Sequence, residues 1–281
     1  MKQPSSLLFA TAGIPLCTEP RNTLNGISEV KRLGLDAMEL EFVQSINVSK
    51  EMAPQVNGIR EKEGVTLTCH GQYFVNLAAK EPEKIEASKK RIIAAATRLS
   101  ECGGWSMCFH PAFYLGRPPE SVYGIVKKNY QAVLDALDDA GVDVWVRPET
   151  TGKPTQFGDL LELCKLCADM DSDKALPCID FAHLHARSNG KFNTTEEFRQ
   201  QLELIEKHLG RKALDNMHIH IAGIEYSEKG ERNHLPLAES DMNYKDLCKV
   251  WKEFKVKGVV VCESPIMEKD AMMLKKVYQA V

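Results

Sequence analysis

Short apolar runs alternate with longer amphipathic segments along the chain. The short runs are rich in Val, Ile, Leu and aromatic residues and are bounded by Gly, Pro or polar residues, which is typical of buried strands. They predict strands at 7–10, 36–43, 65–70, 105–110, 142–149, 176–180, 217–220 and 258–263. The segments between them, often followed by Gly, predict helices at 23–33, 49–63, 82–102, 119–140, 155–170, 193–210, 243–254 and 268–280.

This alternation predicts the α/β class with a parallel sheet, because each parallel strand pair needs a helical crossover. Eight such units in 281 residues fit a single (β/α)8 TIM barrel, with 1–281 as one domain. The alternative is an open doubly wound sheet, which would carry a Gly-rich turn after its first strand. Only Gly13 stands there, so we favour the barrel. The longest connection, 221–242, follows the seventh strand, where long loops are often functional.

Six of the predicted strands end on, or next to, a side chain that can bind a metal ion. These residues are His70, His110, Glu149, Asp180, His218 and Glu263. Barrel enzymes keep their chemistry at the carboxyl ends of the strands, so we expect these side chains to converge there. A mixture of imidazole and carboxylate suits zinc, manganese, iron or cobalt.

The histidines support the same interpretation. Of the 8 histidines, only His208 falls on a predicted helix, where we expect a surface position. The others lie at strand ends or in the loops that follow: His70, His110, His183, His185, His218, His220 and His234. These are more ligands than one ion needs. Two or three ions are therefore expected, and a carboxylate such as Glu149 could bridge a pair of them.

Three segments carry a resemblance to a known family. Residues 69–77 (Cys-His-Gly-Gln-Tyr-Phe-Val-Asn-Leu), 109–111 (Phe-His-Pro) and 178–183 (Cys-Ile-Asp-Phe-Ala-His) resemble motifs of the endonuclease IV family of apurinic/apyrimidinic endonucleases. Glu149, His218 and Glu263 fit the remaining strand-end positions of that family. The broader group is the xylose-isomerase-like barrels, which include sugar isomerases and epimerases.

The resemblance implies a zinc-dependent phosphodiesterase that hydrolyses DNA at abasic sites, with two or three Zn²⁺ ions, or Mn²⁺ in their place. It implies one ion on His70, His110 and Glu149, a second on Glu149, Asp180, His218 and Glu263, and a third on His183 and His234. Glu149 and Glu263 would be catalytic. The loops at the same face also carry Tyr73, which could stack on a base, and Arg187 and Arg232, which could neutralise phosphates, so we expect these three residues to contact the substrate. The expected partner is DNA with abasic sites.

Two alternatives stay open. Glu149, Asp180, His218 and Glu263 also resemble the single-metal set of the sugar isomerases and epimerases. A barrel that binds metal without turnover is the other alternative. The loop after the second strand carries no Arg, and the loop after the seventh strand has Glu231 and His234 three residues apart in place of an Asp-x-His pair.

The net charge, the apolar runs and the cysteine content narrow the classes of protein to which this chain can belong. The net charge is -3, which argues against nonspecific polyanion binding through bulk charge. No apolar run approaches the roughly 20 residues of a membrane span, and the N-terminus shows no signal peptide. The 9 cysteines suit reduced, buried thiols in a cytoplasmic, monomeric protein. Cys164 and Cys167 have CxxC spacing on a predicted helix, which favours a core role over a redox or zinc role.

One charge inside the predicted barrel needs a partner. Arg147 lies two residues before Glu149, so strand alternation points both side chains into the barrel. Burying an unpaired guanidinium costs several kcal/mol, and strand two offers Glu39 and Glu41 as partners. We therefore expect a buried Arg147–Glu pair. The alternative is a bulge at Pro148 that turns Arg147 outward.

Overall fold

The computed structural model describes residues 3–281 and confirms the TIM barrel. Parallel strands form an 8-stranded sheet in the order β6-β4-β3-β2-β1-β12-β9-β8. Its members are β1 (Leu7–Ala12), β2 (Ala37–Glu41), β3 (Thr66–His70), β4 (Ser106–Phe109), β6 (Trp145–Pro148), β8 (Cys178–Asp180), β9 (Met217–Ile221) and β12 (Gly258–Cys262). The edge strands β6 and β8 approach at a parallel bridge between Glu149 and Cys178, so the barrel is nearly closed.

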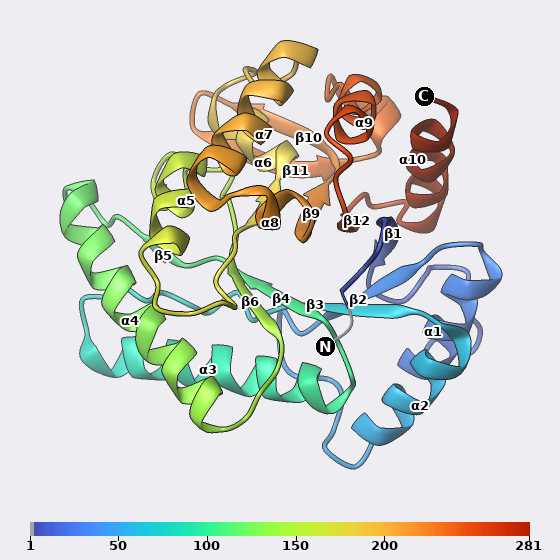
Figure 1. Ribbon diagram of the computed structural model, residues 1–281, viewed down its shortest axis with the longest axis horizontal. Coiled ribbons are helices and arrows are strands. Elements are labelled where there is room, and N and C mark those ends of the chain that lie inside the picture. The colour runs from blue at the N-terminus through green and yellow to red at the C-terminus, as the bar shows by residue number, and fades with distance from the viewer. Residues whose placement is uncertain (1–2) are drawn as a thin grey trace.

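Helices surround the ring of strands, and the first strand pairs with the last (Figure 1). The long helices are α1 (Thr23–Arg32), α2 (Ala53–Glu63), α3 (Pro82–Glu101), α4 (Pro119–Asp139), α5 (Leu160–Ala168), α7 (Thr195–Leu209), α9 (Tyr244–Glu253) and α10 (Glu268–Ala280). In the described part of the chain, no helix combines the length and the apolar composition needed to cross a membrane.

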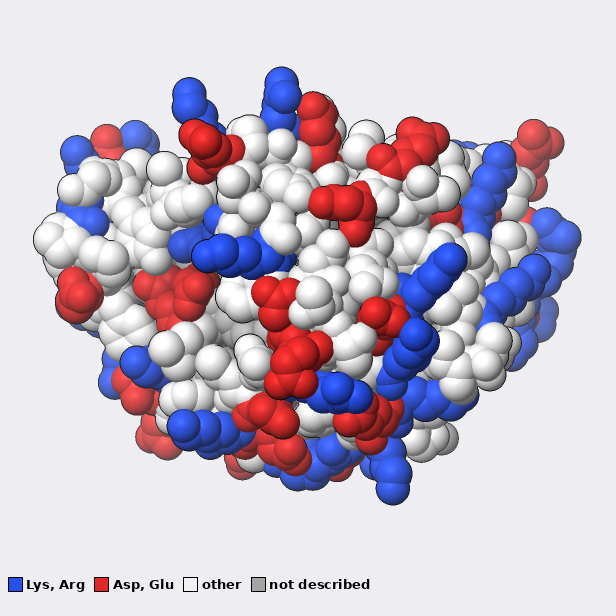
Figure 2. Space-filling view, turned by 90° about the horizontal axis from the view of Figure 1, so that it is seen from above, with Lys and Arg blue, Asp and Glu red and all other residues white. Residues whose placement is uncertain are grey.

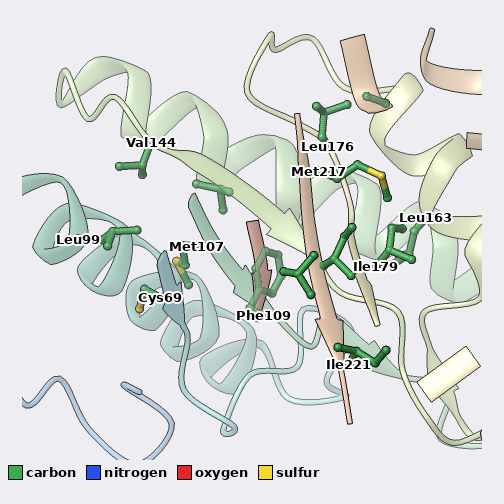
Figure 3. Close-up of a cluster of buried hydrophobic side chains, with 14 of the residues drawn as sticks. Cys69, Leu99, Met107, Phe109, Val144, Leu163, Leu176, Ile179, Met217 and Ile221 are labelled. Carbon is green, nitrogen blue, oxygen red and sulfur yellow. The ribbon is translucent and has the colours of Figure 1, made fainter. Parts of the chain in front are cut away.

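Strand alternation divides the buried side chains into two layers. On β9, Met217, Ile219 and Ile221 belong to the hydrophobic core cluster between strands and helices. Figure 3 shows part of this cluster. His218 and His220 alternate with them and therefore face the barrel axis, where both are fully buried. The same strand thus anchors the helix layer and supplies the interior with imidazoles.

Local signals explain where two helices begin. The helix expected from 155 starts at Leu160, because residues Gln156–Phe157 form β7 and pair with β5 (Ala112–Phe113). Asp159 then caps α5 in a capping box with Glu162. At α7, Thr194 and Glu197 form the same arrangement.

The long connection after β9 has structure of its own. It folds as an antiparallel hairpin of β10 (Gly223–Ser227) and β11 (Gly230–Leu235), followed by a 3-10 turn at Leu237–Glu239. A short helix, α6 (Phe181–Arg187), follows β8 directly and packs against this hairpin. A second short helix, α8 (Arg211–Leu214), precedes β9. The hairpin and α6 carry chemistry-bearing side chains over the carboxyl ends of the strands.

The expected Arg147–Glu pair is wrong, although Arg147 does point inward and is only 1% exposed. Its guanidinium donates to Ser106 Oγ at 2.7 Å, to Asn216 Oδ1 at 3.0 Å and to the Pro177 carbonyl at 3.4 Å. It also lies over two indole rings, those of Trp105 and Trp145, at 5.2 and 4.9 Å from their centroids. Neutral oxygens and aromatic faces solvate the cation, and burial lowers its pKa to about 10.

Candidate functional site

Glu149 is the centre of a cluster at the carboxyl ends of the strands. It directly follows β6 and is completely buried. Its Oε2 lies 3.3 Å from His70 Nε2 and 3.4 Å from His110 Nε2. Its Oε1 lies 3.1 Å from His220 Nδ1 and 3.6 Å from His183 Nδ1. The two oxygens therefore face different histidines, which is the arrangement of a carboxylate that bridges two metal positions.

The first ligands lie beside one oxygen of Glu149: ligand atoms of His70 lie within 4.8 Å of those of Cys108 and Glu149, and ligand atoms of His110 lie within 4.8 Å of those of Glu149 and His183. His70 ends β3, and His110 directly follows β4. The Nδ1 of His70 lies 2.7 Å from the Gly71 carbonyl, which fixes the ring so that Nε2 points to Glu149. Such a backbone partner on one ring nitrogen is how proteins orient a metal-binding imidazole.

A second group contains Glu149, Asp180, His220 and Glu263, whose ligand atoms all lie within 4.8 Å of one another. Asp180 ends β8 and caps α6 by accepting from the backbone N–H of His183 at 2.8 Å through Oδ1, while its Oδ2 makes no hydrogen bond. Glu263, which follows β12, places Oε1 3.4 Å from His220 Nδ1.

The structure places His220, not His218, in this second group, which corrects the expectation from the sequence. His218 lies one layer deeper, where its Nε2 is 3.0 Å from Glu39 Oε2 and its Nδ1 is 3.1 Å from Ser106 Oγ. The reason is that β9 extends to Ile221. Both histidines face inward, and the one further along the strand reaches its carboxyl end.

The third group lies under the hairpin. Ligand atoms of Asp180, His183 and His234 lie within 4.8 Å of one another. Glu231 on β11 brings Oε2 to 3.5 Å from His183 Nε2, and its Oε1 is 4.0 Å from His234 Nε2. Glu231 and His234 thus both lie beside His183, although this chain has no Asp-x-His pair in the loop.

Several buried polar atoms of the cluster have no hydrogen-bond partner within the described part of the protein. Among the described residues, buried atoms without a hydrogen-bond partner include Glu41 Oε1, Glu149 Oε2, Asp180 Oδ2, His110 Nε2 and His234 Nε2. Buried polar atoms are normally satisfied, and all of these residues except Glu41 belong to the groups of close ligand atoms. Carboxylate oxygens and imidazole nitrogens in this arrangement fit divalent cations, which would satisfy them.

Charge within the cluster shifts several pKa values. Burial disfavours the charged imidazole of His70, but contact with Glu149 outweighs it and raises the His70 pKa to about 10. The pKa of His183 rises to about 9 against the same desolvation, chiefly because of Asp180. Burial would raise the pKa of Glu149, yet His220 and His110 hold it well below its ordinary value.

Two carboxyl groups of the cluster have raised pKa values. Burial, reinforced by the charge of Glu39, raises the pKa of Glu41 to about 8. Burial also raises the pKa of Asp180 to about 6. Sequence reasoning assigned Glu39 and Glu41 to ion pairing and did not place Glu41 in the site. The signal was available, since Glu41 ends strand two as the other ligands end theirs.

The expected substrate-binding residues have different surroundings. Tyr73 is 51% exposed at the mouth, with its ring 5.5 Å from that of His70. Arg187 is occupied elsewhere: it donates to Thr151 Oγ1 at 3.1 Å and to the Gln156 carbonyl at 2.9 Å, so it ties loops together. Arg232 is largely exposed and pairs with Glu225 at 3.1 Å.

Sequence comparisons connect this barrel to known proteins. A family model described as the xylose isomerase-like TIM barrel matches residues 27–277. An uncharacterized protein of Methanocaldococcus jannaschii is 43% identical over 278 residues, 99% of each chain. A probable endonuclease 4 of Chlorobium phaeovibrioides is 27% identical over 156 residues, 54% of each chain.

Solved structures share the fold at low sequence identity. A D-tagatose 3-epimerase-like protein superposes with a TM-score of 0.74 at 15% identity, over 97% of this chain and 96% of that one. Endonuclease IV from Thermus thermophilus superposes with a TM-score of 0.69 at 20% identity, over 99% and 98% of the two chains. The barrel, its buried clusters of metal-binding side chains and a family match over most of the sequence lead to one conclusion: the chain belongs to the xylose isomerase-like TIM barrel family.

Proposed function

We propose that the protein is a metal-dependent phosphodiesterase that uses two or three divalent ions, zinc foremost, to hydrolyse DNA at abasic sites. One observation carries the proposal. His70 and His110 both lie against the Glu149 oxygen that points away from His220. A single-ion site needs only the group of Glu149, Asp180, His220 and Glu263, so the additional imidazoles supply a second ion position.

The residues present account for the parts of a phosphodiester hydrolysis. Bound ions supply a nucleophile from water at neutral pH and neutralise charge on the phosphoryl group. Glu263, whose pKa is lowered and whose side chain is 13% exposed, is ionised and can accept a proton from water at the mouth. Tyr73 offers an exposed aromatic ring beside His70 on which a base or sugar can stack.

Two of the proteins compared above support this choice of chemistry. A sequence relative from Chlorobium phaeovibrioides is named a probable endonuclease 4, and the superposed structure from Thermus thermophilus is an endonuclease IV. The distribution of surface charge also bears on how the protein would bind DNA. Figure 2 shows acidic and basic side chains spread over the face in view, with basic ones gathered toward its right side. The proposal therefore rests on the metal-binding groups rather than on a general affinity for nucleic acid.

The test is incision of a labelled duplex that contains one abasic site, by zinc-loaded protein. We expect wild-type incision and a loss of at least about 100-fold in His110→Ala, because losing even an outer partner of a metal ligand costs about 10–100-fold. His208→Ala, a histidine on helix α7 away from the site, should incise like wild type. No incision by wild type above the His110→Ala level overturns the proposal.

A second candidate is a sugar isomerase or epimerase. Its support is the four-residue group of Glu149, Asp180, His220 and Glu263, in which two ionised carboxylates flank one ion position and could exchange a proton with carbon. Several superposed structures are epimerases, including that of D-psicose 3-epimerase. Epimerisation of a ketose that survives His110→Ala would favour this candidate, since His110 lies outside the four-residue group.

A further inference from the structure

We propose that the barrel holds a second, deeper metal site, formed by Cys108, Cys178, His218 and His220, which takes a thiophilic divalent ion such as zinc. The site lies inside the barrel, one layer below the carboxylate-rich cluster at the strand ends. It concerns a different ion and shares only His220 with the ligands of the upper cluster, so its test does not depend on the reaction proposed above.

The four side chains converge from three strands. Cys108 belongs to β4, Cys178 to β8, and both histidines to β9. Each is completely buried, and one ligand atom from each lies within 4.8 Å of all the others. Tetrahedral zinc with bonds of about 2.0–2.3 Å separates its ligand atoms by about 3.3–3.8 Å, so small side-chain adjustments suffice.

The two thiols have different surroundings from most of the other buried cysteines. Cys69, Cys164 and Cys262 belong to the hydrophobic core cluster between strands and helices, whereas Cys108 and Cys178 do not. Cys108 Sγ instead lies 3.7 Å from His220 Nε2. Two thiols and two imidazoles that share one space inside a barrel are the ligand set of a structural zinc site.

Groups around the four ligands would orient them. Glu39 places one oxygen 3.0 Å from His218 Nε2, and its other oxygen lies 3.0 Å from His220 Nε2, the nitrogen that the ion would take. Ser106 Oγ, 3.1 Å from His218 Nδ1, is itself held by Arg147. A carboxylate or hydroxyl on the second ring nitrogen is the usual support of a metal-binding histidine.

The charges of the ligands allow a divalent ion to be buried at this depth. Without the ion, Arg147 and Glu39 are both buried in this layer, and Glu39 faces His218 and His220. When a divalent cation enters, the four ligands give up their protons, so that Cys108 and Cys178 are thiolates and both imidazoles are neutral. The two negative charges offset the ion, so the interior gains no net charge and avoids the penalty of an uncompensated one.

His220 connects the two levels of the barrel. Its Nδ1 faces Glu149 and Glu263, and its Nε2 faces Glu39 and Cys108. An ion in the deep site takes Nε2 and displaces Glu39 from it, while Nδ1 stays directed at the upper cluster. Occupation of the deep site is therefore coupled to the orientation of an upper ligand.

X-ray absorption at the zinc edge of zinc-loaded, full-length protein tests the site directly. We expect a sulfur shell at about 2.3 Å, distinct from nitrogen and oxygen at about 2.0–2.2 Å. The sulfur shell should vanish in Cys108→Ser/Cys178→Ser and persist in Cys262→Ser, a control on a buried thiol in the core cluster. A cobalt-loaded sample should show sulfur-to-cobalt charge-transfer absorption with the same dependence.

Several outcomes overturn the proposal. The first is a folded, zinc-loaded wild type without sulfur scattering, which needs no variant and so holds even if the double variant misfolds. A sulfur shell that survives the double substitution would assign the sulfur to another cysteine. A thiol titration of unfolded protein that reveals a Cys108–Cys178 disulfide would also exclude the site. Abasic-site incision plays no part in these measurements.

Discussion

At the scale of single residues, Glu149 is the most constrained side chain of the upper cluster, because both of its oxygens face imidazoles. Replacing it with glutamine keeps the shape but removes the charge and one acceptor. We expect Glu149→Gln to bind zinc at least about 10–100-fold more weakly. Competition with a zinc chelator measures this, and Glu203→Gln on the exposed side of α7 is the control. Equal affinity in both variants would show that Glu149 is not a ligand.

The buried guanidinium of Arg147 satisfies oxygen acceptors inside the barrel. Arg147→Met should lower the free energy of unfolding by about 1–3 kcal/mol, because Asn216 Oδ1 and the Pro177 carbonyl lose their buried donor. Arg199→Met, which breaks an exposed pair with Glu253, should cost about 0–1 kcal/mol. Urea denaturation measures both. A more stable Arg147→Met would mean that the acceptors find other partners.

Residue positions were predictable where strand ends decide them. His70, His110, Glu149, Asp180 and Glu263 meet because the carboxyl ends of parallel strands share one face. His218 and His220 lie on the same face of β9, so the alternation of side chains does not decide which of them joins the upper cluster. That depends on where the strand ends. The contacts of Arg187 depend on how separate loops pack against each other, and no local pattern carries that information.

At the scale of elements, β12 begins at a glycine whose backbone no other residue fits. Gly258 has a φ of +127°, and an added Cβ would stand 1.9 Å from the Met217 carbonyl oxygen. Gly258→Ala should lower the free energy of unfolding by at least about 1–3 kcal/mol, the cost of such strain. It should also disturb the pairing of β12 with β9, which holds His220.

Gly124→Ala is the matched control. Gly124 lies within α4, and an added Cβ there would contact nothing within 4 Å. The substitution should stabilise the protein by about 0.5–1 kcal/mol, because alanine loses less backbone entropy in a helix. Thermal unfolding of the two variants beside wild type decides the matter. A Gly258→Ala variant as stable as wild type would contradict the assigned strain.

The main strands and helices follow from apolar periodicity and helix-stop residues. The elements that the pattern missed are short or pair locally: β5 with β7, the hairpin of β10 and β11, and α6. β11 is largely polar, so it lacks the apolar alternation that reveals a strand. α6 starts directly on Asp180, without a loop to announce it.

At the scale of the whole molecule, the raised pKa values link stability to pH. In metal-free protein, the pKa of His70 is about 10 and that of His183 about 9, both above the unfolded value of about 6.5. The folded state then holds protons that the unfolded state releases. This stability is fully present below about pH 6.5 and is lost as the pH rises through 9 to 10.

We therefore expect the melting temperature of chelator-treated protein to fall steadily between about pH 6.5 and 10. Zinc-loaded protein should lose less, because the ion has already displaced the imidazole protons. Differential scanning calorimetry of both forms measures the two slopes. A melting temperature of the chelated form that is constant or rises with pH would contradict the protonated state of His70 and His183.

We infer that this barrel holds more than one ion at the carboxyl ends of its strands. Anomalous diffraction at the zinc edge, from crystals of zinc-loaded protein, locates each ion directly. We predict one peak between His70, His110 and Glu149 and another between Glu149, Asp180, His220 and Glu263. A single peak within the second group, with none beside His70 and His110 at full zinc loading, would contradict the claim.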